Sequence, residues 1–167
     1  MDVTTSLRAA TPDDAALILR ITRESWTGRV DPASSAFRET EEQIAAQLAD
    51  GGGLVLYVDR VAAGSVRHSP VTGDANVSPH GAAWEVRRMG VLPQFRGRGY
   101  ALALMNAVIS RALASGICDL RLAVRADQPR LIDVYACMGF ALAPEIEYAH
   151  ASPGSSPPTV MRRLLSA

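Results

Sequence analysis

The chain has 167 residues, of which 48% are hydrophobic and 20% charged, a composition typical of a single globular domain rather than a disordered chain. Its 17 basic and 17 acidic residues give a net charge of zero, which provides no reason to expect a nucleic acid or a polycation as partner. All 17 basic residues are arginines, and the absence of lysine excludes a Schiff-base lysine and the lysine of a P-loop NTPase.

The cysteines, the histidines and the N-terminus narrow the class of protein further. Cys118 and Cys137 lie in apolar segments without CxxC spacing, which predicts reduced, buried thiols rather than a disulfide or a catalytic pair. The three histidines are scattered along the chain, so no metal site is expected. The polar N-terminus lacks a signal-peptide pattern, and no apolar run approaches the ~20 residues of a membrane span. These features predict a cytoplasmic protein without a membrane partner.

The N-terminal part of the chain combines two helices with two strands. In chain order the pattern predicts a strand over Leu7–Ala9, a helix from Thr11, a loop over Trp26–Phe37, a helix from Thr40 to Gly51, and strands over Leu54–Val58 and Val61–Arg67. Both helices open with a capping-box pattern, Thr11 with Asp14 and Thr40 with Gln43. Pro12 suits the first helical position, where its missing N–H has no partner to lose.

The C-terminal part alternates strands and helices. It is predicted to contain a polar loop over Ser69–Gly81, a strand over Trp84–Leu92, a helix over Gly99–Ser115, a strand over Leu120–Val124, a helix over Pro129–Met138 ended by Gly139, and strands over Ala141–Ala149 and Thr159–Leu165 around a loop over Ser152–Pro158. Gly90 interrupts its strand, which indicates either a β-bulge or the close approach of another backbone.

The order of these elements predicts the fold class. We expect an α/β (α+β) fold in which residues 1–167 form one domain with a mixed central sheet of six to seven strands and about four flanking helices. The strand from Trp84, the following helix and the strand ending at Val124 should form a right-handed parallel crossover. A bulged strand would then lead directly into the loop before Gly99.

That loop, between Val91 and Ala101, contains the pattern Gln94-x-x-Gly97-x-Gly99. Two glycines let successive N–H groups turn into one concavity, and the helix that follows adds the positive end of its dipole. With the charges of two flanking arginines, these parts suit a pyrophosphate, although a plain turn is the alternative. A Rossmann loop is poorly supported because Leu102 stands where its third glycine would be, and a P-loop would need a lysine.

Two stretches resemble the signatures of the GNAT superfamily of N-acetyltransferases. The strand, loop and helix around Gln94-x-x-Gly97-x-Gly99 resemble its motif A, and Tyr135-x-x-Met138-Gly139-Phe140 resembles its second signature; together they span residues 84–140. The resemblance implies acetyl-CoA as cosubstrate. It implies that pantetheine pairs with the backbone of Met89, Gly90 and Val91, that the pyrophosphate lies at the loop, and that Gln128, where the family often has asparagine, donates a hydrogen bond to pantetheine. The implied residues of the loop are Gln94, Phe95, Arg96, Gly97, Arg98, Gly99, Tyr100 and Ala101.

The resemblance also implies the catalytic groups. Glu85 is the candidate general base that takes the proton of the amine, directly or through water, and Tyr135 the acid that protonates the sulfur of CoA. A backbone N–H near Val91 would stabilise the oxyanion. Alternatives remain at this point: Glu85 could be a strand residue paired with Arg87 or Arg88, and Tyr135 a core tyrosine.

The implied function is an N-acetyltransferase that moves an acetyl group from acetyl-CoA to a primary amine by direct attack. Neither cysteine is an obvious acyl carrier, which disfavours an acyl-enzyme. The alternative is a non-catalytic acyl-CoA-binding module with the same fold. The acceptor, a small-molecule or peptide amine, is not specified by the sequence, and a homodimer is left open.

Overall fold

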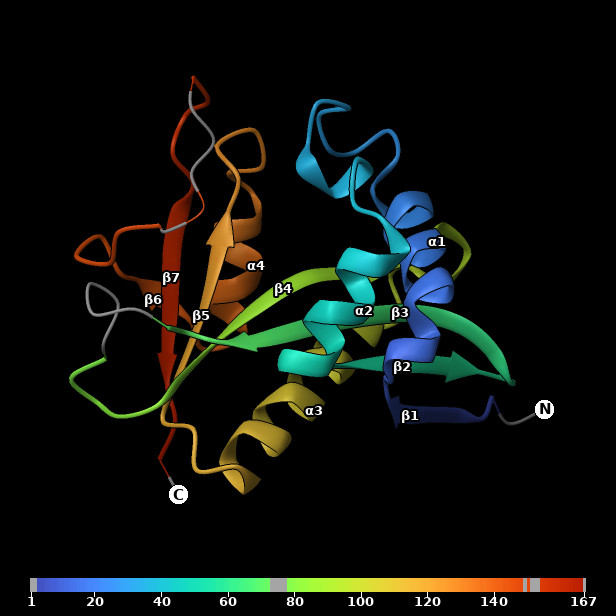
Figure 1. Cartoon of the computed structure of the whole chain (residues 1–167), viewed down its shortest axis with the longest axis horizontal. Coiled ribbons are helices and arrows are strands. Elements are labelled where there is room, and N and C mark those ends of the chain that lie inside the picture. Colours follow the sequence, from blue (N-terminus) through green and yellow to red (C-terminus); the bar gives the residue numbers. More distant parts are fainter. Residues whose placement is uncertain (1–2, 73–77, 149, 151–153, 167) are drawn as a thin grey trace. The chain divides into compact units, whose positions relative to one another are not determined.

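The computed structural model describes residues 3–72, 78–148, 150 and 154–166 (Figure 1). Its elements are β1 Thr5–Ala9, α1 Ala15–Trp26, α2 Glu41–Asp50, β2 Gly52–Val58, β3 Val61–Pro70, β4 Ala83–Val91, α3 Tyr100–Ala114, β5 Asp119–Val124, α4 Leu131–Cys137, β6 Ala141–Leu142 and β7 Thr159–Leu164. The strands follow the order β1-β2-β3-β4-β5-β7-β6, with β4 and β5 parallel. This mixed seven-stranded sheet with its four α-helices confirms the predicted fold class among the described residues.

The chain forms two compact units, which are described separately. The first unit comprises residues 1–69 and 86–108, and the second comprises residues 70–85 and 109–167. The strand β4 and the helix α3 each contribute residues to both units. No helix in the described part of the chain is long and apolar enough to cross a membrane.

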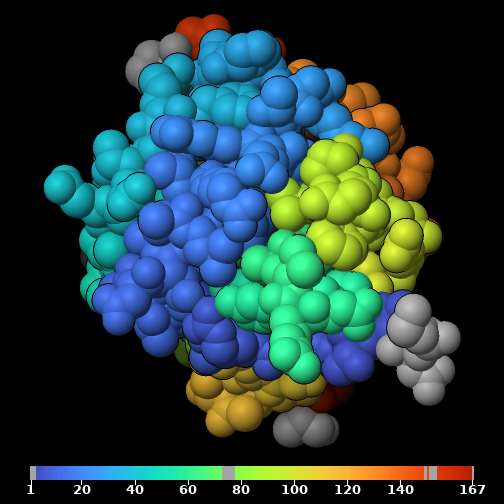
Figure 2. Space-filling view, turned by 90° about the vertical axis from the view of Figure 1, so that its right-hand side faces the viewer, coloured from blue at the N-terminus to red at the C-terminus, as the bar shows by residue number. Residues whose placement is uncertain are grey.

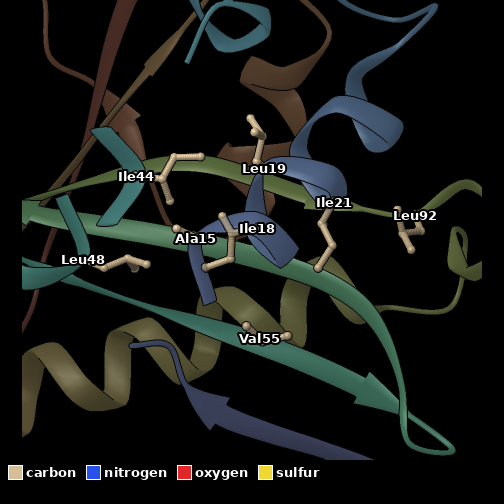
Figure 3. Packing of buried hydrophobic residues seen from close by; sticks show 8 residues of the cluster. All are labelled: Ala15, Ile18, Leu19, Ile21, Ile44, Leu48, Val55 and Leu92. Atoms are coloured by element: carbon tan, nitrogen blue, oxygen red, sulfur yellow. The ribbon is translucent and has the colours of Figure 1, made fainter. Parts of the chain in front are cut away.

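The core of the first unit lies between its two N-terminal helices and β2. Figure 3 shows the side chains that converge there: Ala15, Ile18, Leu19, Ile21, Ile44, Leu48, Val55 and Leu92. Leu92 follows β4 directly, is only 2% exposed, and donates its N–H to the carbonyl of Ala63 at 2.8 Å. Burial of this side chain therefore fixes the point at which the glycine-containing loop leaves the sheet.

The two predicted capping boxes are present, but the first of them precedes a 3₁₀ turn and not the expected α-helix. Thr40 and Gln43 exchange side-chain-to-backbone hydrogen bonds of 3.0 and 3.2 Å at the start of α2. At Thr11 the carboxylate of Asp14 accepts the backbone N–H at 2.8 Å, yet residues Pro12–Asp14 form a 3₁₀ turn and α1 begins only at Ala15. The reason is the backbone of Asp14, whose ψ of 2° departs from α-helical values.

In the second unit, β5 lies between β4 and β7. It pairs in parallel with Ala83–Glu85 and antiparallel with all six residues of β7. The predicted strand over Ala141–Ala149 is wrong in length, because β6 ends at Leu142. Pro144 has no N–H to donate to a ladder, and the chain turns where Ile146 donates to the carbonyl of Ala143 at 3.1 Å.

The prediction that both thiols are buried is wrong. Both cysteines are free, but Cys137 is exposed and Cys118 is only half-buried. Cys137 is the last residue of α4, a helix with no fully buried residue. Parts of three further predictions lie outside the described residues: Ala149 of the predicted strand, residues 152–153 of the C-terminal loop, and residues 73–77 of the loop before β4.

Candidate active site

The glycine-containing loop begins with a 3₁₀ turn over Pro93–Phe95 and ends where α3 begins at Tyr100. Gly97 and Gly99 have φ values of +73° and +78°, in the left-handed region that glycine enters without steric cost. A Cβ at either position would meet nothing within 4 Å, so the loop is open on this side. The carbonyl of Gly99 accepts the N–H of Ala103 at 3.0 Å, the first bond of α3, so the amides before Ala103 are available to an anion at the helix start.

Two of the loop amides already have partners inside the turn. The N–H of Phe95 donates to the carbonyl of Leu92 at 2.9 Å, and that of Arg96 to Pro93 at 3.3 Å. The candidate donors for a phosphate are therefore the amides that follow them in the loop, from Gly97 to Tyr100.

The two arginines of the loop differ in their contacts. Arg96 donates through Nε to the carbonyl of Val91 at 3.3 Å and through Nη2 to the carbonyl of Ser25, and desolvation lowers its pKa. Arg96 thus ties the loop to β4 and α1. Figure 2 shows the loop after β4, in yellow-green, at the surface beside the blue helix α1. Arg98 and Gln94 are exposed there, whereas Ala101 is half-buried in the first turn of α3.

Gly90 lies close to a side chain of α1, whereas the sequence had suggested a bulge or the approach of another backbone. A Cβ on Gly90 would collide with Oγ of Ser25 and lie 3.0 Å from its Cβ. The backbone irregularity of β4 lies two residues earlier, at Arg88, whose φ is +54°. The carbonyl of Met89 accepts the indole N–H of Trp26 at 3.3 Å, and a carbonyl oxygen keeps a second lone pair for a ligand.

The second unit holds both candidate catalytic side chains. Glu85 lies in β4 opposite Arg121 of β5, its side chain is 15% exposed, and Oε2 lies 3.8 Å from Nε2 of His150. An ion pair between Glu85 and Arg88 is not what the structure shows, because Arg88 instead bonds Glu39 within the first unit. Glu85 thus lies near the exposed side chain of a histidine.

Tyr135 lies in the short helix α4 of the same unit. Its ring packs edge-to-face against Phe140 with centroids 6.1 Å apart, and burial raises the pKa of its phenol to about 12. A phenol with that pKa holds its proton at neutral pH, as a general acid must. Gln128 precedes the same helix, where its carbonyl accepts the N–H of Leu131 at 3.0 Å, and it is half-buried.

The end of α4 agrees with the predicted signature. Gly139 has a φ of +86°, and Arg163 of β7 donates to the carbonyl of Met138 at 2.7 Å. A Cβ on Gly139 would lie 3.2 Å from that guanidinium. Glycine is therefore favoured here by the left-handed backbone, and a Cβ would also press against the arginine that caps the helix.

Sequence reasoning missed a buried polar cluster next to Glu85. Asp119 is fully buried and accepts hydrogen bonds from Ser78 at 2.6 Å and from Nε and Nη2 of Arg121 at 3.2 Å. The alternation of Asp119 and Arg121 with leucines was visible in the sequence, but it does not reveal that both faces of β5 are buried. Asp119 and Arg121 lie on β5, where Arg121 is the register partner of Glu85 of β4.

A second missed cluster lies in the first unit. Arg67 of β3 is only 2% exposed, and it donates to Glu39 at 2.6 Å, which in turn accepts from Arg88 at 3.1 Å. These residues are 28 and 49 positions apart, so no short motif signals them.

We expect Gly99→Val to abolish the thermal stabilisation by acetyl-CoA. For the unchanged protein this stabilisation should amount to about 2.7 kcal/mol at 100 times Kd. A β-branched residue resists the left-handed backbone that presents the loop amides. The matched control is Gly116→Val, because Gly116 has a similar φ of +72° and equally open surroundings at the end of α3. Differential scanning should show the acetyl-CoA shift in the control; the same shift in Gly99→Val would contradict the assignment of the loop.

Comparison with known proteins identifies the family. The acetyltransferase (GNAT) family model matches residues 16–140, which is most of the chain, and the chain belongs to this family. A mycothiol acetyltransferase from Renibacterium salmoninarum is 27% identical over 137 residues, 81% of this chain and 40% of that protein. The chain thus spans less than half the length of the curated relatives it matches.

Solved structures show the same fold. The PaiA N-acetyltransferase from Thermoplasma acidophilum, in complex with coenzyme A, aligns with a TM-score of 0.74 and 16% identity over 97% of this chain and 99% of that one. The ribosomal-protein-S18-alanine N-acetyltransferase from Escherichia coli aligns with a TM-score of 0.72 and 16% identity over 98% of this chain and 96% of that one.

Proposed function

We propose that this protein, acting as one domain, transfers an acetyl group from acetyl-CoA to a primary amine. The observation that carries the proposal is the loop with two left-handed glycines, which joins β4 directly to the start of α3 in a GNAT chain. Such a loop provides backbone N–H groups and a helix dipole to a pyrophosphate. The coenzyme A complex of the PaiA neighbour supports a CoA donor.

The donor would lie along the first unit from β4 to α3. The backbone of Met89, Gly90 and Val91 would pair with the pantetheine arm, and the amides from Gly97 to Tyr100 would hold the pyrophosphate. The exposed side chain of Arg98 is free to approach the phosphates from solvent. Arg96 would act on the donor indirectly, because its guanidinium bonds two protein carbonyls that fix the loop.

The proposed reaction is a direct attack that needs two proton transfers. The neutral amine nitrogen bonds to the acyl carbon, the carbon–sulfur bond breaks, and the sulfur takes the proton of Tyr135. Glu85 takes the proton of the attacking amine, directly or through water. For an amine with a pKa near 10.4, the neutral form costs about 4–5 kcal/mol at pH 7, which is why a base is needed. A backbone N–H near Val91 would stabilise the oxyanion.

For the acceptor, we propose a primary amine on a small molecule or at a peptide N-terminus. One similar protein is named a mycothiol acetyltransferase, and another is named for an alanine of a ribosomal protein. These two names support an amine acceptor while differing in its size. A panel of amines should therefore include small-molecule amines, free amino acids and short peptides with N-terminal alanine.

The pH profile of Glu85→Gln tests the proposed base and separates an enzyme from a binding module. The glutamine keeps the size and hydrogen bonding of Glu85 but takes no proton. From pH 6 to 10, the deficit in kcat/KM should be largest near neutral pH and shrink as the amine loses its own proton near pH 10. Tyr135 adds no feature in this range, because its pKa is about 12.

The control for this profile is Glu147→Gln, an exposed carboxylate of the same unit. Superimposable profiles of the unchanged protein and Glu85→Gln would remove Glu85 from the mechanism. Acetyl-CoA binding without turnover of any amine, in the unchanged protein, would instead support the non-catalytic module.

A further inference from the structure

Arg88 has an unusual backbone for its place in the fold. Among the described residues, three non-glycine residues have positive φ: Asp59 and Arg60 in the turn after β2, and Arg88 inside β4. L-residues rarely adopt this conformation, and it persists only where surrounding contacts over-determine it. The contacts of the Arg88 side chain must therefore be strong enough to hold its backbone at a positive φ.

The guanidinium of Arg88 is held on three sides. Its Nε donates to Oε1 of Glu39 at 3.1 Å, and its Nη2 donates to Oγ of Ser35 at 3.0 Å. The third contact is a cation–π contact, with the guanidinium carbon 5.4 Å from the ring centre of Trp26. All three partners come from the end of α1 and the segment between α1 and α2, and together with Arg88 they form what we call the Arg88 clamp.

The central carboxylate of the clamp is itself immobilised. Glu39 is 8% exposed, and its second oxygen accepts from Nη2 of Arg67 at 2.6 Å. Arg67 is 2% exposed and donates its other nitrogen, Nη1, to Gln47 of α2 at 2.6 Å. Because Glu39 is bonded from two sides in a buried site, it cannot follow Arg88 if the strand changes conformation.

The clamp acts directly before the backbone that is proposed to meet pantetheine. Trp26 contacts the Arg88 guanidinium and also donates its indole N–H to the carbonyl of Met89. Gly90 lies against Ser25 of the same helix. A change in the backbone of Arg88 would therefore rotate the peptide groups from Met89 to Val91 out of their observed directions.

We propose that Arg88 is a positioning residue for the acyl-CoA donor. Its side chain, fixed by Glu39, Ser35 and Trp26, keeps the backbone of Arg88 left-handed within β4 and so directs the peptide groups of Met89, Gly90 and Val91 toward pantetheine. The inference rests on the proposed donor site. Arg88 itself need not touch the donor.

The test is a series of four substitutions that all remove the clamp but differ in their tolerance of left-handed backbone: Arg88→Gly, Arg88→Asn, Arg88→Ala and Arg88→Val. The Kd of coenzyme A is measured by titration calorimetry, which requires no acceptor. The Gly variant should bind within about threefold of the unchanged protein, since glycine adopts the conformation freely. The Ala variant should bind about tenfold more weakly, with Asn between them and Val weakest.

The matched control is Arg87→Ala, which removes a neighbouring half-buried arginine without a left-handed backbone and should bind coenzyme A as the unchanged protein does. Melting temperatures without ligand identify variants that are merely less stable, since a purely structural role would lower the melting temperature without changing the Kd of coenzyme A.

If the Val variant does not fold, the order of the other three variants carries the test. A flat series, or a Gly variant as weak as the Ala variant, would overturn the positioning role while leaving donor binding intact. Failure of the unchanged protein to bind coenzyme A would overturn both.

Discussion

Replacing Tyr135 with phenylalanine is expected to lower kcat about 10²-fold, the size of effect typical for loss of a general acid. The substitution keeps the ring and its edge-to-face contact with Phe140 but removes the proton that would go to the CoA sulfur. The Kd of acetyl-CoA should stay unchanged, because the phenol is proposed to act only when the carbon–sulfur bond breaks. Steady-state kinetics with a responsive amine and calorimetry with acetyl-CoA measure the two quantities.

The pH dependence sharpens this expectation. Because burial raises the pKa of Tyr135 to about 12, the phenol keeps its proton throughout the range from pH 6 to 10. The deficit of the phenylalanine variant should therefore be the same at every pH in that range, unlike that of Glu85→Gln. Tyr57→Phe, which removes a hydroxyl bonded to Arg8 in the first unit, is the control for loss of a tyrosine hydroxyl. A Tyr135→Phe variant with unchanged kcat would make Tyr135 a packing residue.

Replacing Glu39 with glutamine is expected to lower the free energy of unfolding by about 3 kcal/mol, because removal of one partner from a buried ion pair leaves uncompensated charge. Here the charge left behind is that of Arg67, 2% exposed, and of Arg88 beside it. Because so little solvent reaches the side chain of Arg67, desolvation lowers its pKa. For a domain of this size, a loss of 3 kcal/mol corresponds to roughly 10 °C in melting temperature.

Chemical denaturation of Glu39→Gln measures this loss. The control is Glu42→Gln, an exposed carboxylate in the first turn of α2, which should change stability by no more than about 0.5 kcal/mol. Equal stability of the two variants would contradict the view that Glu39 neutralises the buried arginines.

Predictions from the sequence were correct where a residue is favoured by its own backbone conformation or by a partner within one helical turn. Gly97, Gly99 and Gly139 were each predicted at a turn or helix end, and each has a positive φ that favours glycine. Thr40 and Gln43 form the predicted capping box because both partners lie within one helical turn. The shortness of β6 was also predictable in principle, since Pro144 cannot donate to a ladder.

Sequence reasoning was limited where distant contacts decide the structure. The sequence drew attention to Gly90, the residue with the freest backbone, whereas the positive φ of β4 lies at Arg88, whose guanidinium is bonded to Glu39 and Ser35 and lies over Trp26. Gly90 is required instead by the proximity of Ser25. The contact of Glu85 with His150 joins residues 65 positions apart, and no local pattern indicates it.

The most direct test of the proposed activity is release of free thiol from acetyl-CoA in the presence of single amines. We expect amine-dependent thiol release with at least one member of the panel, with the acetyl group recovered on the nitrogen of that amine. Tyr135→Phe should lower the rate with the same amine about 10²-fold. Thiol release that is no faster with any amine than without one, from protein shown to bind acetyl-CoA, would contradict the account and favour a non-catalytic acyl-CoA-binding module.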